Sequence, residues 1–133
     1  LAVLETLDKG LLMANLIDFD MIFGHRQNAA GFGRALEEFD AWLPELYGAM
    51  RFEDLLVICA DHGCDPTTPG SDHTREYVPA LLWSKAMARG HALGDRHSFA
   101  DIAATLADFF QTPGMVAGES FLPSLGLQKG VNS

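Results

Sequence analysis

Residues 54–83, "DLLVICADHGCDPTTPGSDHTREYVPALLW", hold two apolar segments with a polar, turn-rich loop between them. The first segment, "DLLVICA" (54–60), is continuously apolar after its first residue, which is typical of a central parallel strand covered on both faces. The second, "YVPALLWS" (77–84), is also apolar, but a proline cannot donate a hydrogen bond to a neighbouring strand. Pro79 therefore predicts that this strand begins near residue 79 or lies towards a sheet edge.

The flanking sequence alternates helical patterns with apolar segments. "LLMANLID" (11–18) is short and mostly apolar, and it predicts a third, buried strand. The spacing of apolar residues predicts helices within 1–10, 28–50 and 98–111. The Gly-, Pro- and Ser-rich tail from residue 114 predicts mostly irregular structure. Helices that alternate with buried strands indicate an α/β fold with a mostly parallel central sheet flanked by helices.

Length and charge limit the classes of protein to which this chain can belong. With 133 residues it is long enough for one domain with a core and too short for two ordinary domains. A formal net charge of −9 argues against binding to nucleic acid through its phosphates and to an anionic membrane surface. The sequence also lacks an apolar run of the roughly 18–20 residues that a membrane span needs. We therefore expect no nucleic-acid partner and no membrane partner.

The cysteines and the first residues bear on where the protein works. Cys59 and Cys64 fit neither a CxxC redox pair nor a disulfide framework, so we interpret both as reduced thiols in a cytoplasmic protein. The first ten residues are acidic and amphipathic, without the basic region that begins a signal peptide. They also lack an initiator methionine, so we expect the chain to be processed or to be part of something longer.

Side chains that bind metals gather directly after two of the predicted strands. In open α/β sheets, functional groups collect just beyond the carboxyl ends of the strands, so this position suits an active site. One cluster follows the segment 11–18 and the other follows the segment 54–60. The candidate ligands are Asp20 and His25 in the first cluster, and Asp61, His62 and His73 in the second.

Each candidate also has an ordinary structural interpretation. An aspartate after a strand often caps a turn, and a lone histidine can simply be hydrogen-bonded near the surface. This interpretation weakens for the group, because three of the five histidines lie in the two clusters. His91 and His97 have no such acidic partners and are interpreted as surface or loop residues. Asp72 is interpreted as a loop residue or as an outer group that orients an imidazole, since it is adjacent to His73 and neighbouring side chains of extended backbone point apart.

The residue types indicate the kind of ion. Carboxylates and imidazoles without suitably spaced thiolates favour a hard or borderline divalent ion such as Mn²⁺, Mg²⁺, Zn²⁺ or Fe²⁺. Five ligands exceed the needs of one tetrahedral site and fit two ions that share a site. Two neighbouring ions suit phosphoryl transfer, because they hold the transferred group and activate the attacking oxygen. Pooled carboxylates repel one another without cations, so the cluster implies its metals.

Four segments carry a resemblance to a known family: "NLIDFDMIFGHRQN" (15–28), "ALEEFDAWLPEL" (35–46), the segment 54–83 and "SFADIAATLADFF" (98–110). Together they resemble the C-terminal part of bacterial phosphopentomutase, a metal-dependent mutase of the alkaline phosphatase superfamily. The resemblance runs in register from about residue 10 to residue 122, and "ADHGCDPTTPGSDHTREYVP" is its most specific motif. It implies an alkaline-phosphatase-like core, of which residues 1–133 are only the C-terminal part.

The resemblance also implies a ligand set and a reaction. Two Mn²⁺ ions are expected, with Mg²⁺ or another divalent ion as the alternative. Asp61 and His62 match ligands of one ion, whereas Asp20, His25 and His73 match ligands of the other. The family interconverts ribose or deoxyribose 1-phosphate and the 5-phosphate, with a phosphorylated threonine as phosphoryl donor and a bisphosphate intermediate.

The nucleophilic threonine, a further aspartate ligand and the sugar-recognising cap domain of the family lie outside these 133 residues. Thr67, Thr68 and Thr74 match loop positions, so we predict no catalytic residue in this chain and no activity from it alone. The missing N-terminal half or another chain is then needed to cover the sheet edge and to bind the pentose phosphate substrate. Two alternatives stay open: another phosphomutase or phosphatase of the superfamily, and a non-catalytic metal-binding module.

Overall fold

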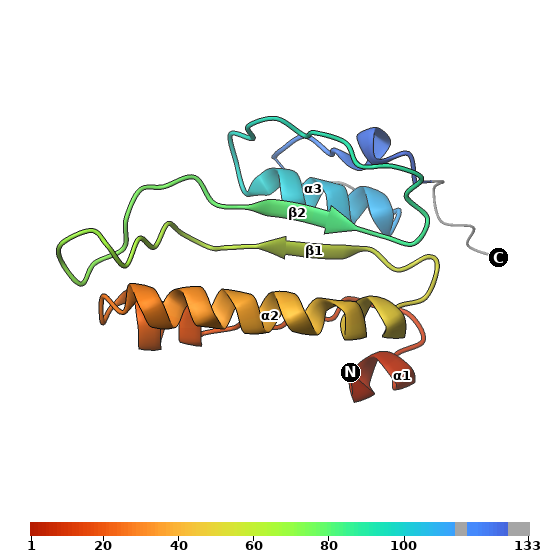
Figure 1. Ribbon diagram of the computed structural model, residues 1–133. Coiled ribbons are helices and arrows are strands. Elements are labelled where there is room, and N and C mark those ends of the chain that lie inside the picture. The colour runs from red at the N-terminus through yellow and green to blue at the C-terminus, as the bar shows by residue number, and fades with distance from the viewer. Residues whose placement is uncertain (114–116, 128–133) are drawn as a thin grey trace. The chain divides into compact units, whose positions relative to one another are not determined.

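The computed structural model describes residues 1–113 and 117–127 of the chain. Its elements, in chain order, are α1 (Ala2–Thr6), the π-helix η1 (Phe19–Gly24), α2 (Ala29–Ala49), β1 (Leu56–Cys59), β2 (Ala80–Trp83), α3 (Ala100–Phe109) and the 3-10 helix η2 (Leu122–Leu125) (Figure 1). The chain forms two compact units, one of Leu1–Met50 with Val57–Leu82, the other of Arg51–Leu56 with Trp83–Ser133. Helices and strands are both present, as the α/β class requires.

The sheet consists of β1 and β2. β1 lies inside the predicted strand 54–60, and β2 begins directly after Pro79. The two strands pair with each other and run in opposite directions (Figure 1). The described residues contain no parallel strand pair, so the predicted parallel central sheet is not observed. The connection explains the antiparallel pairing: a parallel crossover usually needs a helix, whereas residues 60–79, all of which the structure describes, contain none.

The segment 11–18 is not the predicted buried strand. Residues 11–16 have no regular secondary structure, and their apolar side chains are exposed, Leu11 by 62% and Met13 by 85%. A strand is held by hydrogen bonds to a neighbouring strand, and the described residues supply no such neighbour to this segment. Its apolar pattern therefore marks a surface that the described part of the chain leaves uncovered.

α2 is the helix predicted within 28–50. The Asn28 side chain caps it by accepting a hydrogen bond from the Gly31 N–H at 3.0 Å. η1 packs against α2 through Phe19 and Phe32, whose ring centroids lie 5.5 Å apart in an edge-to-face arrangement. Across 1–113 and 117–127, no helix combines the length and the apolarity needed to cross a membrane.

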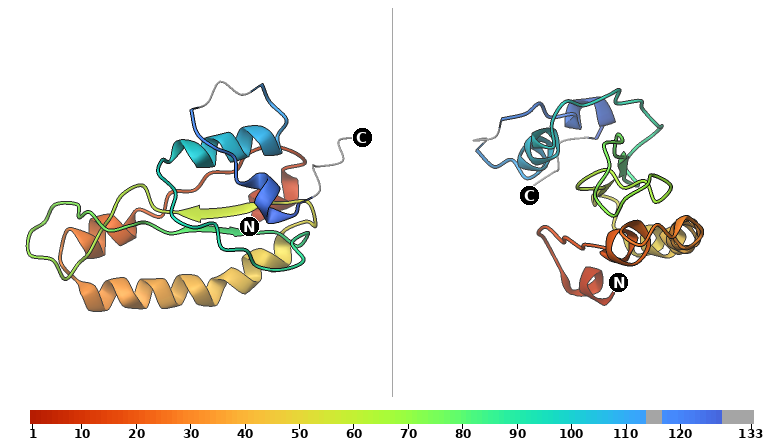
Figure 2. Two further views of the ribbon diagram at one scale, coloured as in Figure 1. Left: turned by 90° about the horizontal axis from the view of Figure 1, so that it is seen from above. Right: turned by 90° about the vertical axis from the view of Figure 1, so that its left-hand side faces the viewer.

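The buried apolar residues of the second unit lie in η2 and directly before it. Phe121, Leu122 and Leu125 are only 2%, 3% and 2% exposed. The prediction of a mostly irregular tail overlooked this helix, because one 3-10 turn is too short to show a period. Three residues make one turn of a 3-10 helix, so Leu122 and Leu125 share one face. α3 and η2 lie next to each other in the further views (Figure 2).

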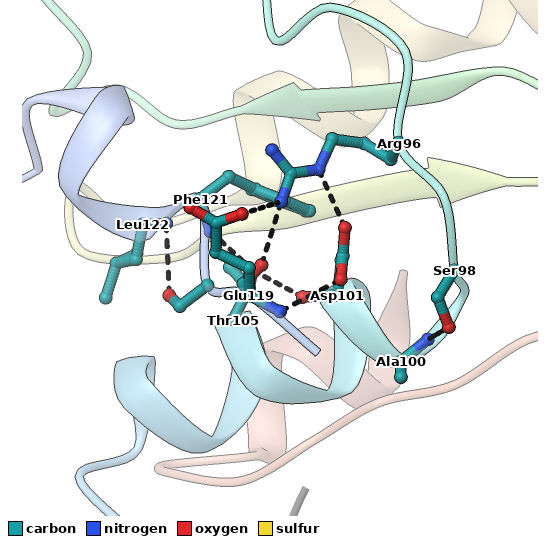
Figure 3. Close-up of polar contacts among 9 residues, drawn as sticks. Arg96, Ser98, Ala100, Asp101, Thr105, Glu119, Phe121 and Leu122 are labelled. Carbon is teal, nitrogen blue, oxygen red and sulfur yellow. Dashed lines mark hydrogen bonds and ion pairs between the residues drawn. The ribbon is translucent and has the colours of Figure 1, made fainter. Parts of the chain in front are cut away.

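A buried carboxylate ties the tail to α3. Asp101 accepts hydrogen bonds from the Glu119 N–H at 2.9 Å and from the Arg96 Nε–H at 2.7 Å (Figure 3). Thr105 donates its hydroxyl to the Asp101 carbonyl at 2.7 Å and accepts from the Phe121 N–H at 3.1 Å. These bonds satisfy polar groups that would be costly to bury alone. The hydrogen bond from the Glu119 N–H has the largest effect on the pKa of Asp101, and the hydrogen bond from Arg96 has the next largest. Together they hold that pKa below its usual range.

Asp101→Asn is therefore expected to lower the urea midpoint of unfolding near neutral pH, and the difference from the wild type should vanish in acid. A carboxylate whose folded-state pKa is depressed contributes stability above its ordinary pKa, 3.8, and loses that contribution as the pH falls through the folded-state value. Circular dichroism of urea unfolding at a series of pH values measures this. Asp95→Asn, an exposed loop aspartate, is the control and should change little. A gap that persists unchanged from neutral to strongly acidic pH would contradict the prediction.

Candidate metal centre

Asp20 and His25 are brought together by the π-helix η1. The His25 N–H donates to the Asp20 carbonyl, five residues back, at 2.9 Å. The wide turn leaves 3.2 Å between His25 Nε2 and Asp20 Oδ2. Gly24 is buried, and a Cβ there would collide with the Cys64 Sγ and lie 3.1 Å from the Phe19 carbonyl oxygen. The glycine thus lets the loop after β1 approach this turn closely.

His62 and His73 are brought together by an isolated antiparallel bridge. Gly63 pairs with Thr74, whose N–H donates to the Gly63 carbonyl at 3.1 Å. A Cβ at residue 63 would lie 2.6 Å from the Thr74 carbonyl oxygen, so a side chain at this position would prevent the approach. The two imidazoles stack, with ring centroids 3.6 Å apart and 20° between the ring planes.

The two pairs form one cluster within the first unit. His73 Nε2 lies 3.5 Å from Asp20 Oδ1, and the His73 and His25 ring centroids lie 5.0 Å apart. Ligand atoms of Asp20, His62 and His73 all lie within 4.8 Å of one another. Four of the five candidate ligands named from the sequence therefore converge on one place.

Asp61 lies at the margin of this cluster. Its side chain is 82% exposed, with 3.6 Å between Asp61 Oδ1 and His62 Nε2. The family resemblance groups His62 with Asp61, whereas in space His62 also lies with Asp20 and His73. Asp72 is exposed, and so are His91 and His97, which belong to the second unit.

The hydrogen bonds of two imidazoles direct their Nε2 atoms towards the cluster. Nδ1 of His25 contacts the Ser71 carbonyl oxygen, and Nδ1 of His62 lies 3.1 Å from the Gly63 carbonyl oxygen. A carbonyl oxygen only accepts, so each Nδ1 carries a proton, and in the neutral ring each Nε2 keeps its lone pair. Metal-binding histidines are commonly oriented by carbonyls in this way.

Asp20 Oδ1 is the atom that most needs a cation. It is buried and accepts no hydrogen bond from any residue that the structure describes. The other carboxylate oxygen, Oδ2, faces the lone pair of His25 Nε2 at 3.2 Å. The Asp20 side chain as a whole is 29% exposed, but its Oδ1 has lost contact with water without gaining a hydrogen bond. A proton or a metal ion between this carboxylate and the neighbouring imidazoles would offset that cost. One carboxylate and several imidazoles form a donor set that fits a divalent ion.

Cys64 lies beside the cluster as a half-buried free thiol. Burial raises the pKa of its thiol, and the negative charges of Asp20, Glu76 and Asp65 raise it further. In the absence of a nearby cation the thiol is therefore protonated at neutral pH.

Two residues of the surrounding framework were not predicted. Gln27 Nε2 donates to the Thr68 carbonyl at 2.9 Å, and the Asp65 carboxylate accepts hydrogen bonds from Thr67 and Thr68. An aspartate followed by hydroxyl residues two and three positions later is typical of an Asx turn, so the sequence did contain a signal for Asp65. Nothing local in the sequence points to Gln27.

The chain is similar to a group of known proteins. The family model of the metalloenzyme superfamily matches residues 1–114. A relative named phosphopentomutase from Syntrophotalea carbinolica is 57% identical over 122 residues, which cover 92% of this chain and 31% of the relative. Relatives of the same name come from Caldanaerobacter subterraneus subsp. tengcongensis (51% identical, 98% of this chain, 34% of the relative) and Hahella chejuensis (55%, 84% and 27%). The chain thus spans about a third of the length of the curated relatives it matches.

Proposed function

The chain belongs to the metalloenzyme superfamily, and we propose that it is the C-terminal part of the metal-binding core of a phosphopentomutase. The support is the name shared by relatives that are 50–57% identical to it. In this proposal residues 1–133 all belong to the core, and an N-terminal core segment and a cap domain lie outside them. A cytoplasmic location is proposed as well, supported by the free thiols of Cys59 and Cys64.

The proposed reaction interconverts ribose or deoxyribose 1-phosphate and the corresponding 5-phosphate. A phosphorylated threonine transfers its phosphoryl group to the free hydroxyl of the pentose phosphate, which leaves a bisphosphate and a free threonine. The threonine then takes back the other phosphoryl group, so phosphate is neither gained nor lost. This threonine is proposed to lie outside residues 1–133, and no residue of the chain is assigned a catalytic role.

One observation carries the metal site: Asp20 Oδ1 is buried and accepts no hydrogen bond from the described residues, yet it lies 3.5 Å from His73 Nε2. We assign Asp20, His25 and His73 to one divalent ion, and Asp61 and His62 to a second. Mn²⁺ is the proposed ion, with Mg²⁺ or another divalent ion as the alternative. Bound there, the ions would supply positive charge that offsets the charge of the transferred phosphoryl group. The chain itself holds the ligands together and keeps the Nε2 atoms of His25 and His62 free to bind.

The proposal also accounts for uncovered apolar surface. β1 is an unbroken apolar strand of the kind usually buried on both faces, yet three of its residues are only half-buried and Cys59 is exposed. Leu16 and Ile17 are each 51% exposed, beside the exposed residues 11–13. Exposed apolar surface of this kind marks a contact surface. We propose that the missing N-terminal part, or another chain, covers it and completes an alkaline-phosphatase-like core with a mostly parallel sheet.

An assay of the longer protein that contains this chain tests the proposal. The protein should convert ribose 1-phosphate to ribose 5-phosphate, lose the activity after treatment with a chelator, and regain it with Mn²⁺. Release of inorganic phosphate in place of isomerisation would favour a phosphatase. Metal binding without any turnover would favour a non-catalytic module, and either result would overturn the mutase proposal.

A further inference from the structure

Asp65 connects the two ends of the loop that carries His62 and His73. Its Oδ1 accepts the Thr67 N–H at 2.8 Å and the Thr67 hydroxyl at 2.6 Å, and its Oδ2 accepts the Thr68 hydroxyl at 3.0 Å. Its carbonyl accepts the Thr68 N–H at 3.1 Å, which closes a tight turn. These bonds, led by that from the Thr67 hydroxyl, lower the pKa of Asp65, so the carboxylate is ionised in the folded chain at neutral pH.

The backbone of Asp65 reaches the residue beside His73. The Asp65 N–H donates to the Thr74 Oγ1 at 2.7 Å, next to the bridge between Gly63 and Thr74. Adjacent side chains of extended backbone point to opposite sides. Because the Thr74 side chain faces Asp65, the imidazole of His73 is turned to the other side, where Nε2 lies 3.5 Å from Asp20 Oδ1.

The turn at Asp65 also supports the second ligand-bearing segment. The Thr68 carbonyl accepts the Gln27 Nε2–H at 2.9 Å, and the Ser71 carbonyl contacts Nδ1 of His25. The loop therefore contacts both His25 and Gln27. Its shape, which the Asp65 carboxylate maintains, sets where these carbonyls lie.

We propose that Asp65 is a positioning residue for the metal centre: its carboxylate fixes the turn at Thr67 and Thr68 before an ion binds. The shape of that turn keeps the Asp65 N–H aligned with Thr74, beside His73, and the loop carbonyls aligned with Gln27 and His25. The inference rests on the proposed function, since it presumes that this cluster binds a divalent ion. Ligands held in the bound arrangement bind more tightly, because less ordering is left to occur on binding. Asp65 itself touches no ion in this arrangement.

Calorimetric titration of the chain with Mn²⁺ tests the inference in three variants. Asp65→Ala should weaken binding by about 10- to 100-fold, the usual effect of removing a group that orients metal ligands. Asp65→Asn keeps an acceptor oxygen for Thr67 and should restore most of the affinity, which general loss of stability would not predict. Asp54→Ala is the matched control, because Asp54 also accepts a backbone N–H, that of Arg51 at 2.7 Å, in the other unit. It should bind Mn²⁺ like the wild type.

The outcomes separate this inference from the proposed function. If the wild type binds no Mn²⁺, the metal centre is wrong and both proposals fall. If the wild type binds and Asp65→Ala binds equally well, only the role of Asp65 is overturned. If Asp65→Ala does not fold, Thr67→Val decides: this exposed residue loses one hydrogen bond to Asp65 and should bind about fivefold more weakly. Unchanged affinity in that variant would overturn the inference.

Discussion

His73→Ala is expected to lower the affinity of the chain for Mn²⁺ by more than about 100-fold, because losing a ligand should cost more than losing a group that only orients one. His73 Nε2 lies 3.5 Å from the buried Asp20 Oδ1, and its ring stacks on His62. Its side chain is 49% exposed, so truncation removes little packing and should leave the fold intact. Calorimetric titration of the two proteins at neutral pH measures the difference, with circular dichroism to check the fold.

His91→Ala is the matched control for this measurement. This substitution also removes an imidazole, but from an exposed position in the second unit. The affinity of the variant for Mn²⁺ should equal that of the wild type. Acidification should weaken binding in the wild type, since protons compete with the ion for the ring nitrogens. Equal affinity of His73→Ala and the wild type would show that the cluster is not the binding site.

Residues 1–133 alone are expected to convert ribose 1-phosphate to ribose 5-phosphate at least about 10⁴-fold more slowly than the longer protein, the order of loss seen when a nucleophile is removed. The threonines nearest the cluster are already engaged. The hydroxyls of Thr67 and Thr68 donate to Asp65, and the hydroxyl oxygen of Thr74 accepts the Asp65 N–H. These hydrogen bonds stabilise the loop, and none of the three hydroxyls is positioned as a nucleophile beside the histidines.

Both proteins should be assayed at equal concentration with the same excess of Mn²⁺. A trace of contaminating enzyme is recognised by purifying His73→Ala in parallel, because contamination would be the same in both preparations. Metal-dependent turnover that is present in the wild-type chain and absent from His73→Ala would mean that the chain does carry the nucleophile. The assignment of that group to another segment would then be wrong.

Local patterns were enough to place most of the helices and strands. The apolar stripe within 28–50 corresponds to α2, and the unbroken run in 54–60 corresponds to β1. The segment 11–18 has a similar apolar composition but no strand, because a strand depends on a partner that no local pattern encodes. The antiparallel pairing of β1 and β2 was not predicted for a similar reason, because it depends on how residues 60–79 connect the two strands.

The residue types of the metal centre could be read directly from the chain, because aspartate and histidine carry their ligand chemistry wherever they lie. The π-turn that joins Asp20 to His25 and the stacking of His62 on His73 became visible only in the folded chain. Other contacts of the site link positions that are well separated in sequence: Asp65 and Thr74 are nine positions apart, and His25 and Ser71 are 46 positions apart. Such contacts leave no periodic trace in the sequence, since each depends on where the whole loop packs.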